Sequence, residues 1–167
     1  MEYEHIVHPF GPLYDKKSRV LVLGSLPSVK SREQQFFYGH PQNRYWPVLA
    51  AVFQEPVPKT IEEKKRLALK HHVAMWDTIY SCDIRGSSDS SIKNVVPTDL
   101  RKILEESEIS HVICNGKTSG NYYHRYQEKQ IEIPAIVLPS TSPANAAWNL
   151  ERLIGEWKLL KEFCEPM

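Results

Sequence analysis

The segment FFYGHPQNRYW, residues 36–46, gathers side chains that together could bind a nucleotide. Tyr38 offers an aromatic face on which a flat heterocycle can stack, and Asn43 offers an amide that can match its donor and acceptor edge. Arg44 adds a cation suited to a phosphate outside the pocket. A glycine and a proline interrupt the apolar spacing here, so we interpret residues 36–44 as part of a binding site.

Carboxylates in the same chain could act as general bases. Asp77, Asp83 and Asp89 all lie in one polar stretch that follows an apolar run. Asp77 could equally cap a turn at the end of that run, and the sequence leaves these two roles open. The patterns GxxxxGK[ST], GxGxxG and GxSxG are absent from the sequence, which argues against a nucleoside triphosphatase, a dinucleotide enzyme and a serine hydrolase.

Four short aliphatic stretches predict strands buried on both faces. They are RVLVLG (19–24), VAMWDTI (73–79), HVICNG (111–116) and PAIVLPS (134–140). Helical spacing between them predicts helices over TIEEKKRLALKHH, over PTDLRKILEES, and from near Pro143 through Leu160. A further amphipathic helix is expected from Tyr45 through Phe53. Alternating strands and helices predict a three-layer α/β/α fold with a central four-stranded parallel sheet.

Small polar residues follow every predicted strand, in GSLPSVKS, DTIYSCDIRGSSDSSI, NGKTSGN and PSTSPANA. The carboxyl ends of parallel strands meet at one edge of a sheet, so these exits should converge there. Ser140, Thr141 and Ser142 could hold phosphate oxygens at a helix start, although such residues are most often ordinary caps. The sequence therefore predicts the site at this edge.

Length and composition fit one domain spanning residues 1–167, with 41% hydrophobic and 25% charged residues. The sequence shows no leader and no apolar run long enough to span a membrane. Three scattered cysteines without a CxxC pair predict a reducing, cytoplasmic location, and no metal site is expected. A net charge of +1 requires a local basic patch for any polyanion, and the candidates are Lys30, Arg32, Arg44, Lys93 and Lys117.

The order of GSLPSVKS, FFYGHPQNRYW, CNGK and LPSTSPAN along the chain resembles the uracil-DNA glycosylase superfamily, over nearly the whole sequence. The resemblance is strongest to the hypoxanthine-DNA (deoxyinosine) glycosylase branch. It implies a glycosylase-like α/β fold, a DNA substrate containing deaminated bases, base flipping and no cofactor. Mismatch-specific relatives place a catalytic asparagine in the first motif, whereas this chain has Leu26 there.

The resemblance also implies roles for individual residues. Asn43 takes the place of the catalytic asparagine, and Tyr38 takes the place of the aromatic residue that stacks on the flipped base. The remaining base-binding candidates are Gly24, Ser25, Leu26 and Asn115. The DNA-binding candidates are Ser28, Arg44, Lys117, Ser140, Ser142 and Asn145.

Substrate choice can be argued from hydrogen bonding. The carbonyl and NH₂ of Asn43 could meet the N1–H donor and O6 acceptor of hypoxanthine, and the same pattern occurs in uracil but is reversed in adenine. Guanine must be excluded by its 2-amino group. These expectations describe a monomeric, monofunctional glycosylase that removes hypoxanthine first and uracil as a side reaction.

Three other interpretations stay open at this point. One is a uracil or mismatch glycosylase. Another is a catalytically inactive module that binds nucleic acid or nucleotides, which Leu26 favours. In the third, a structural or interaction protein, the aromatic segment is only core, so Asn43→Ala should change stability alone.

Overall fold

A computed structural model describes residues 2–86 and 88–165 of the chain. Four parallel strands form the central sheet, and their order is β3-β2-β6-β7. The strands are β2 (Val20–Gly24), β3 (Val73–Asp77), β6 (His111–Asn115) and β7 (Ala135–Leu138). Each coincides with one of the aliphatic stretches in the sequence, so the predicted sheet is confirmed.

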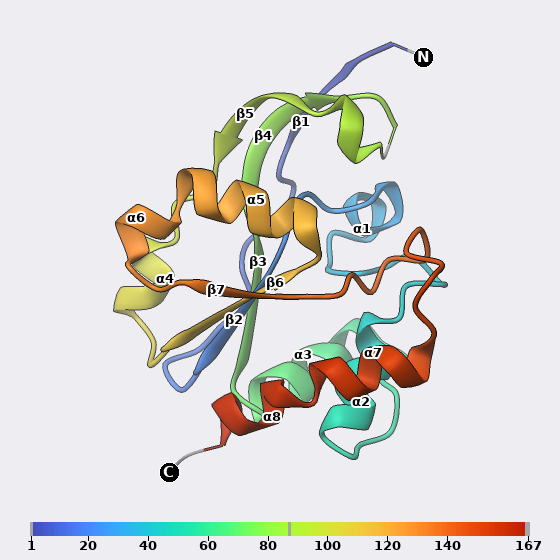
Figure 1. Cartoon of the computed structure of the whole chain (residues 1–167), viewed down its shortest axis with the longest axis vertical. Coiled ribbons are helices and arrows are strands. Elements are labelled where there is room, and N and C mark those ends of the chain that lie inside the picture. The colour runs from blue at the N-terminus through green and yellow to red at the C-terminus, as the bar shows by residue number, and fades with distance from the viewer. Residues whose placement is uncertain (1, 87, 166–167) are drawn as a thin grey trace.

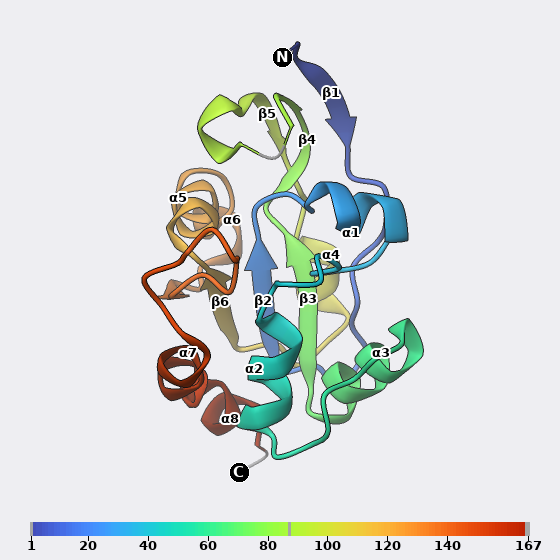
Figure 2. The same cartoon turned by 90° about the vertical axis from the view of Figure 1, so that its right-hand side faces the viewer.

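Helices cover both faces of this sheet, as the three-layer expectation requires (Figure 1). One layer contains α4 (Arg101–Glu105), α5 (Lys117–Tyr126) and α6 (Glu128–Ile131). The other contains α2 (Tyr45–Val52), α3 (Ile61–Lys70), α7 (Leu150–Trp157) and α8 (Leu159–Cys164). The short helix α1 (Val29–Gln34) lies beyond the carboxyl ends of β2 and β3 (Figure 2).

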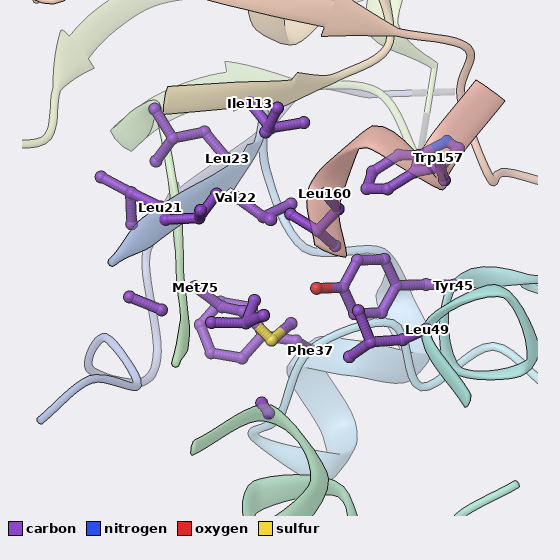
Figure 3. Close-up of a cluster of buried hydrophobic side chains, with 14 of the residues drawn as sticks. Leu21, Val22, Leu23, Phe37, Tyr45, Leu49, Met75, Ile113, Trp157 and Leu160 are labelled. Atoms are coloured by element: carbon purple, nitrogen blue, oxygen red, sulfur yellow. The ribbon is translucent and has the colours of Figure 1, made fainter. Parts of the chain in front are cut away.

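Buried apolar side chains join α2 and the C-terminal helices to the sheet. Figure 3 shows Tyr45 and Leu49 of α2 facing Trp157 and Leu160, with Leu21, Val22 and Leu23 of β2 to their left. Tyr45 and Trp157 are completely buried, and their rings meet edge to face at 5.9 Å. The helix expected from Tyr45 onward is therefore confirmed as a core element that holds the preceding segment against the sheet.

A second, antiparallel sheet was not expected from the sequence. It contains β1 (Glu4–Val7), β4 (Ile79–Ile84) and β5 (Lys93–Pro97) in the order β1-β4-β5, with the short 3₁₀ helix η1 (Asp89–Ser91) between β4 and β5. The polar stretch after β3 was interpreted as a loop, and this was wrong. Only Ile79, Ser81, Cys82 and Ile84 of β4 are buried, so its sequence lacks the aliphatic run of a central strand.

The last helical region starts later than predicted. Residues 143–148 form turns, and α7 begins after Asn149, whose side chain accepts a hydrogen bond of 2.9 Å from the Arg152 backbone N–H. The carbonyls of Ser142 and Asn145 accept hydrogen bonds from the Arg44 side chain instead of from a continuing helix. The prediction of a helix from near Pro143 was therefore wrong. No helix in the described ranges is long and apolar enough to cross a membrane.

Candidate functional site

A cavity of about 980 Å³ opens at the carboxyl edge of the central sheet. All four strands contribute to its lining through the residues that follow them, and the aromatic segment contributes Tyr38 and Asn43. The lining includes Gly24, Ser25, Leu26, Ser28, Asp77, Asn115, Lys117, Ser140, Ser142 and Asn145. The exits of the four predicted strands therefore meet as expected, and the volume is sufficient for a nucleotide-sized group.

Asn43 is held in one orientation by its own carbonyl oxygen. Asn43 Oδ1 accepts hydrogen bonds from the backbone N–H of Tyr45 at 2.8 Å and from Thr141 Oγ1 at 2.9 Å. With both lone pairs of the oxygen used, the amide nitrogen is the group left to face the cavity. Asn43 is thus arranged as a hydrogen-bond donor.

This orientation corrects the substrate argument based on the sequence. The carbonyl of Asn43 was expected to accept a hydrogen bond from the N1–H of a base, but it is already occupied by two donors. Any acceptor for a base N–H must come from another group in the cavity.

Thr141 connects Asn43 to Asn115 across the cavity wall. The Asn115 amide donates to Thr141 Oγ1 at 3.0 Å and its carbonyl accepts from the Thr141 backbone N–H at 3.0 Å. Thr141 is completely buried. From the sequence, Thr141 was expected only to bind phosphate, so its role in positioning the two amides was missed. Asn115, which was expected to contact the base, also holds Thr141 in place.

Tyr38 is packed against Tyr45, with ring centroids 4.2 Å apart and planes 22° from parallel. Its backbone has a left-handed φ of 53°, a conformation that is strained for a bulky residue and that often marks functional segments. The buried hydroxyl has no hydrogen-bond partner among the described residues. Burial raises the pKa of Tyr38, and the nearby Asp77 carboxylate raises it further, so the phenol keeps its proton.

Asp77, Gly24 and the Tyr38 hydroxyl form a buried part of the cavity lining, which we call its floor. A Cβ on Gly24 would lie 2.5 Å from Asp77 Oδ1 and 3.1 Å from the Tyr38 hydroxyl, so glycine is required for these two groups to approach β2. Asp77 Oδ2 pairs with His8 Nε2 at 2.7 Å. His8 could not be identified from the sequence, because it lies in the N-terminal segment, far from every motif.

The other two carboxylates are placed differently. Asp89 lines the rim of the cavity and is exposed, whereas Asp83 pairs with His5 and Asn94 outside it. Of the three acids considered from the sequence, only Asp77 is both buried and in the cavity.

Arg44 holds the loop 139–149 instead of pointing a free guanidinium at solvent. Its side chain donates to the carbonyls of Thr141, Ser142, Asn145 and Trp148. Four such contacts use most of the five N–H donors, so the structure favours a loop-holding role over the expected direct DNA contact.

The loop is also organised by its own polar residues. Ser140 Oγ accepts from the Ser142 backbone N–H, Ser142 Oγ accepts from that of Ala144, and the Asn145 amide donates to the Ser140 carbonyl. These three expected DNA-binding residues therefore shape a compact turn at the edge of the cavity.

The remaining predicted residues lie around the opening. Ser28 caps α1 through a 3.2 Å hydrogen bond from the Ser31 backbone N–H, and Lys117 is exposed at the start of α5. Leu26 packs against the small core of the second sheet, formed by Ile6, Ile79, Cys82 and Ile84. Leu26 thus has a packing role in addition to lining the cavity.

The basic patch proposed from the sequence is only partly assembled. Arg32 and Lys117 line the cavity, whereas Lys30 pairs with Glu33 and Lys93 lies over the Tyr3 ring. Within residues 2–86 and 88–165 no cluster of three or more His, Cys, Asp or Glu side chains could hold a metal ion.

Comparisons with known proteins agree on one family. The sequence model of the uracil DNA glycosylase superfamily matches residues 12–163. A hypoxanthine DNA glycosylase from Methanosarcina acetivorans is 32% identical over 151 residues, which cover 89% of this chain and 94% of that protein. A hypoxanthine DNA glycosylase from Methanosarcina barkeri is 30% identical over 115 residues, or 68% of this chain and 73% of the relative.

A solved structure shows the same fold. It is the solution NMR structure of a Methanosarcina acetivorans protein that is provisionally named a uracil DNA glycosylase. The TM-score is 0.80 at 27% sequence identity, and the match covers 94% of this chain and 97% of the other.

Proposed function

This chain belongs to the uracil DNA glycosylase superfamily, and from that premise we propose that it is a monofunctional DNA glycosylase that removes hypoxanthine from DNA, with uracil as a second substrate. The observation that carries this proposal is the oriented amide of Asn43. Its carbonyl is held by Thr141 and by the backbone of Tyr45, so its NH₂ group is presented to a cavity large enough for a flipped base.

The reaction needs a donor at the departing base. When the N-glycosidic bond breaks, the base takes the bonding electrons and the sugar gains oxocarbenium character. Water then adds to the sugar carbon, and its released proton balances the charge of the departing base. A fixed amide donor stabilises the charge that develops on the base, and one such donor can contribute about 10²–10³ in rate. The adjacent DNA phosphates supply the negative charge near the sugar.

Base flipping restricts which substrates are efficient. Extruding a base costs a few kcal/mol, and the cost is smallest when the base is mispaired. Hypoxanthine and uracil in weak pairs should therefore be released faster than the same bases in stronger pairs. Tyr38, with Tyr45 covering one face of its ring, is the proposed stacking partner for the flipped base.

The proposed enzyme does not cleave the DNA strand itself. Strand cleavage by a glycosylase requires an amine that forms a Schiff base with the sugar. Lys117 is the single lysine in the cavity lining of the described residues, and it is exposed at the edge, where a phosphate contact is the simpler role. We also propose that the protein acts in the cytoplasm as a monomer, without a cofactor.

The test is release of the free base from oligonucleotides that carry one deoxyinosine, one deoxyuridine or only ordinary bases, with a chelator present. The proposal predicts hypoxanthine release, slower uracil release and an intact strand until the abasic site is broken by alkali. Binding to the inosine oligonucleotide without release would identify an inactive binding module instead. Strand cleavage that disappears in Lys117→Ala would show that the enzyme is bifunctional.

A further inference from the structure

A buried Asp77–His8 pair lies at the floor of the cavity, next to the proposed base site. Asp77 Oδ2 and His8 Nε2 are 2.7 Å apart, and their side chains are 5% and 0% exposed. His8 is fixed between Trp76, at 4.3 Å between ring centroids, and Phe10, which meets it edge to face at 4.6 Å. Burying a carboxylate is costly unless it is hydrogen-bonded, and the contact with His8 offsets part of this cost for Asp77.

The contacts of His8 indicate which atoms of Asp77 remain available. The backbone N–H of Phe10 donates to His8 Nδ1 at 3.4 Å, which places the ring proton on Nε2 and makes His8 the donor to Asp77 Oδ2. Asp77 Oδ1 has no hydrogen-bond donor among the residues that the structure describes. It lies next to Gly24, where the Cβ of any other residue would collide with it. Since Asp77 lines the cavity and His8 donates to Oδ2, Oδ1 is the carboxylate oxygen left for a ligand there.

The burial of Asp77 limits which part of a substrate its free oxygen can meet. A flipped nucleotide stays attached to the DNA through its sugar, so the edge of the base opposite the glycosidic bond enters furthest. For hypoxanthine that edge carries N1–H and O6. The oxygen at the floor can accept from N1–H, which is the acceptor that Asn43 does not provide.

We propose that Asp77, positioned by His8, is the specificity-determining residue that accepts the N1–H of hypoxanthine, or the equivalent N3–H of uracil. This inference rests on the proposed glycosylase function. Adenine has an unprotonated N1 at the same place, and its lone pair would face the carboxylate, so adenine is rejected. Because His8 already donates to Oδ2, Asp77 has only one oxygen without a partner, so its contact with the 2-amino group of guanine is not favoured over its contact with N1–H alone.

The test combines one enzyme variant with one substrate analogue. In Asp77→Asn the amide oxygen should take the His8 hydrogen bond, so that NH₂ replaces the free oxygen at the floor. Deoxynebularine carries a purine base with neither N1–H nor O6. Single-turnover release of hypoxanthine and of this purine is measured for the wild type and for Asp77→Asn in the same oligonucleotide, after melting curves have shown that both are folded.

The inference predicts that the wild-type preference for hypoxanthine over purine falls at least about tenfold in Asp77→Asn, which corresponds to about 1.4 kcal/mol of lost discrimination. Differences in leaving-group chemistry are common to both enzymes and cancel. An equal loss of both activities would show that Asp77 acts on the bond-breaking step or on the fold, and would overturn the inference. Failure of the wild type to release hypoxanthine at all would instead refute the proposed function.

A second measurement needs no variant and covers the case in which Asp77→Asn does not fold. The wild type is given 2′-deoxy-1-methylinosine, which keeps O6 but has no N1–H. Release at least about 100-fold slower than from deoxyinosine is expected, because the carboxylate loses its donor and meets a methyl group. Equal release of the two bases would also overturn the inference.

Discussion

At the scale of single residues, the Thr141 hydroxyl is the group on which the site geometry depends most. It accepts from Asn115 and donates to Asn43, and the Thr141 backbone N–H closes a second contact to Asn115. Hydrogen bonding within a buried network of this kind fixes the orientation of both amides. The identity of Asn43 could be inferred from the sequence, but the direction of its amide depends on a residue 98 positions away and could not.

Removing the Thr141 hydroxyl alone tests whether the position of the Asn43 amide controls the rate of base release. In Thr141→Val, with a side chain of nearly the same shape, Asn43 Oδ1 and the Asn115 amide each lose a partner. We expect the rate of base release to fall about 10- to 100-fold, because the donor is no longer held in place, and the free energy of unfolding to fall by about 1–3 kcal/mol. Thr141→Ser keeps the hydroxyl and should retain most of the activity. Equal activity of the Val and Ser variants would contradict this role.

At the scale of elements, the loop 139–149 depends on Arg44, which immediately precedes α2. The guanidinium binds four carbonyls of the loop, and residues 143–148 consequently form turns where the sequence suggested a helix. The strands and most helices could be predicted, since their aliphatic runs and caps are local signals. The second sheet could not, because β4 takes its partners from β1 and β5, and its buried positions include Ser81 and Cys82.

The two possible roles of Arg44 differ in their dependence on salt. Affinity for an oligonucleotide with a non-hydrolysable 2′-fluoro analogue of deoxyinosine is measured over a range of salt concentrations. If Arg44 holds the loop, Arg44→Met should weaken binding at every concentration but leave the slope of log K against log[salt] unchanged. A residue that neutralises one phosphate contributes about 0.9 to that slope.

Lys117→Met is the matched comparison, because Lys117 is exposed at the opening of the cavity. The Lys117→Met change should lower the magnitude of the slope of log K against log[salt] by about 0.9 for a duplex substrate. A smaller magnitude of the salt slope in Arg44→Met would show that Arg44 contacts a DNA phosphate directly, as expected from the sequence.

At the scale of the whole molecule, the central sheet and its two helical layers form a closed core behind an open carboxyl edge. All three cysteines lie in buried positions, Cys114 on β6, Cys164 on α8 and Cys82 in the second sheet. Burial raises the pKa of Cys114 and Cys164 to about 12, and it raises the pKa of Cys82 as well. A single domain over residues 1–167 stays a prediction.

Thiol reactivity reports on the integrity of this core. At pH 8 the three thiols should remain protonated and inaccessible, so a disulfide reagent such as Ellman's reagent should react with none of them in the folded protein. Three equivalents should react once the protein is unfolded in denaturant. Rapid labelling of Cys114 at pH 8 under native conditions would contradict the buried position of β6.

The most direct test of the account is single-turnover release of hypoxanthine by Asn43→Asp. Aspartate keeps the oxygen that accepts from Thr141 and from the Tyr45 backbone, so the fold and the melting temperature should be nearly unchanged, but it replaces the NH₂ donor with a second acceptor. We expect the rate of hypoxanthine release to fall by about 100-fold or more, although the Asn43→Asp protein is folded. Release at the wild-type rate by a folded Asn43→Asp would show that the amide of Asn43 is not the donor that assists bond cleavage.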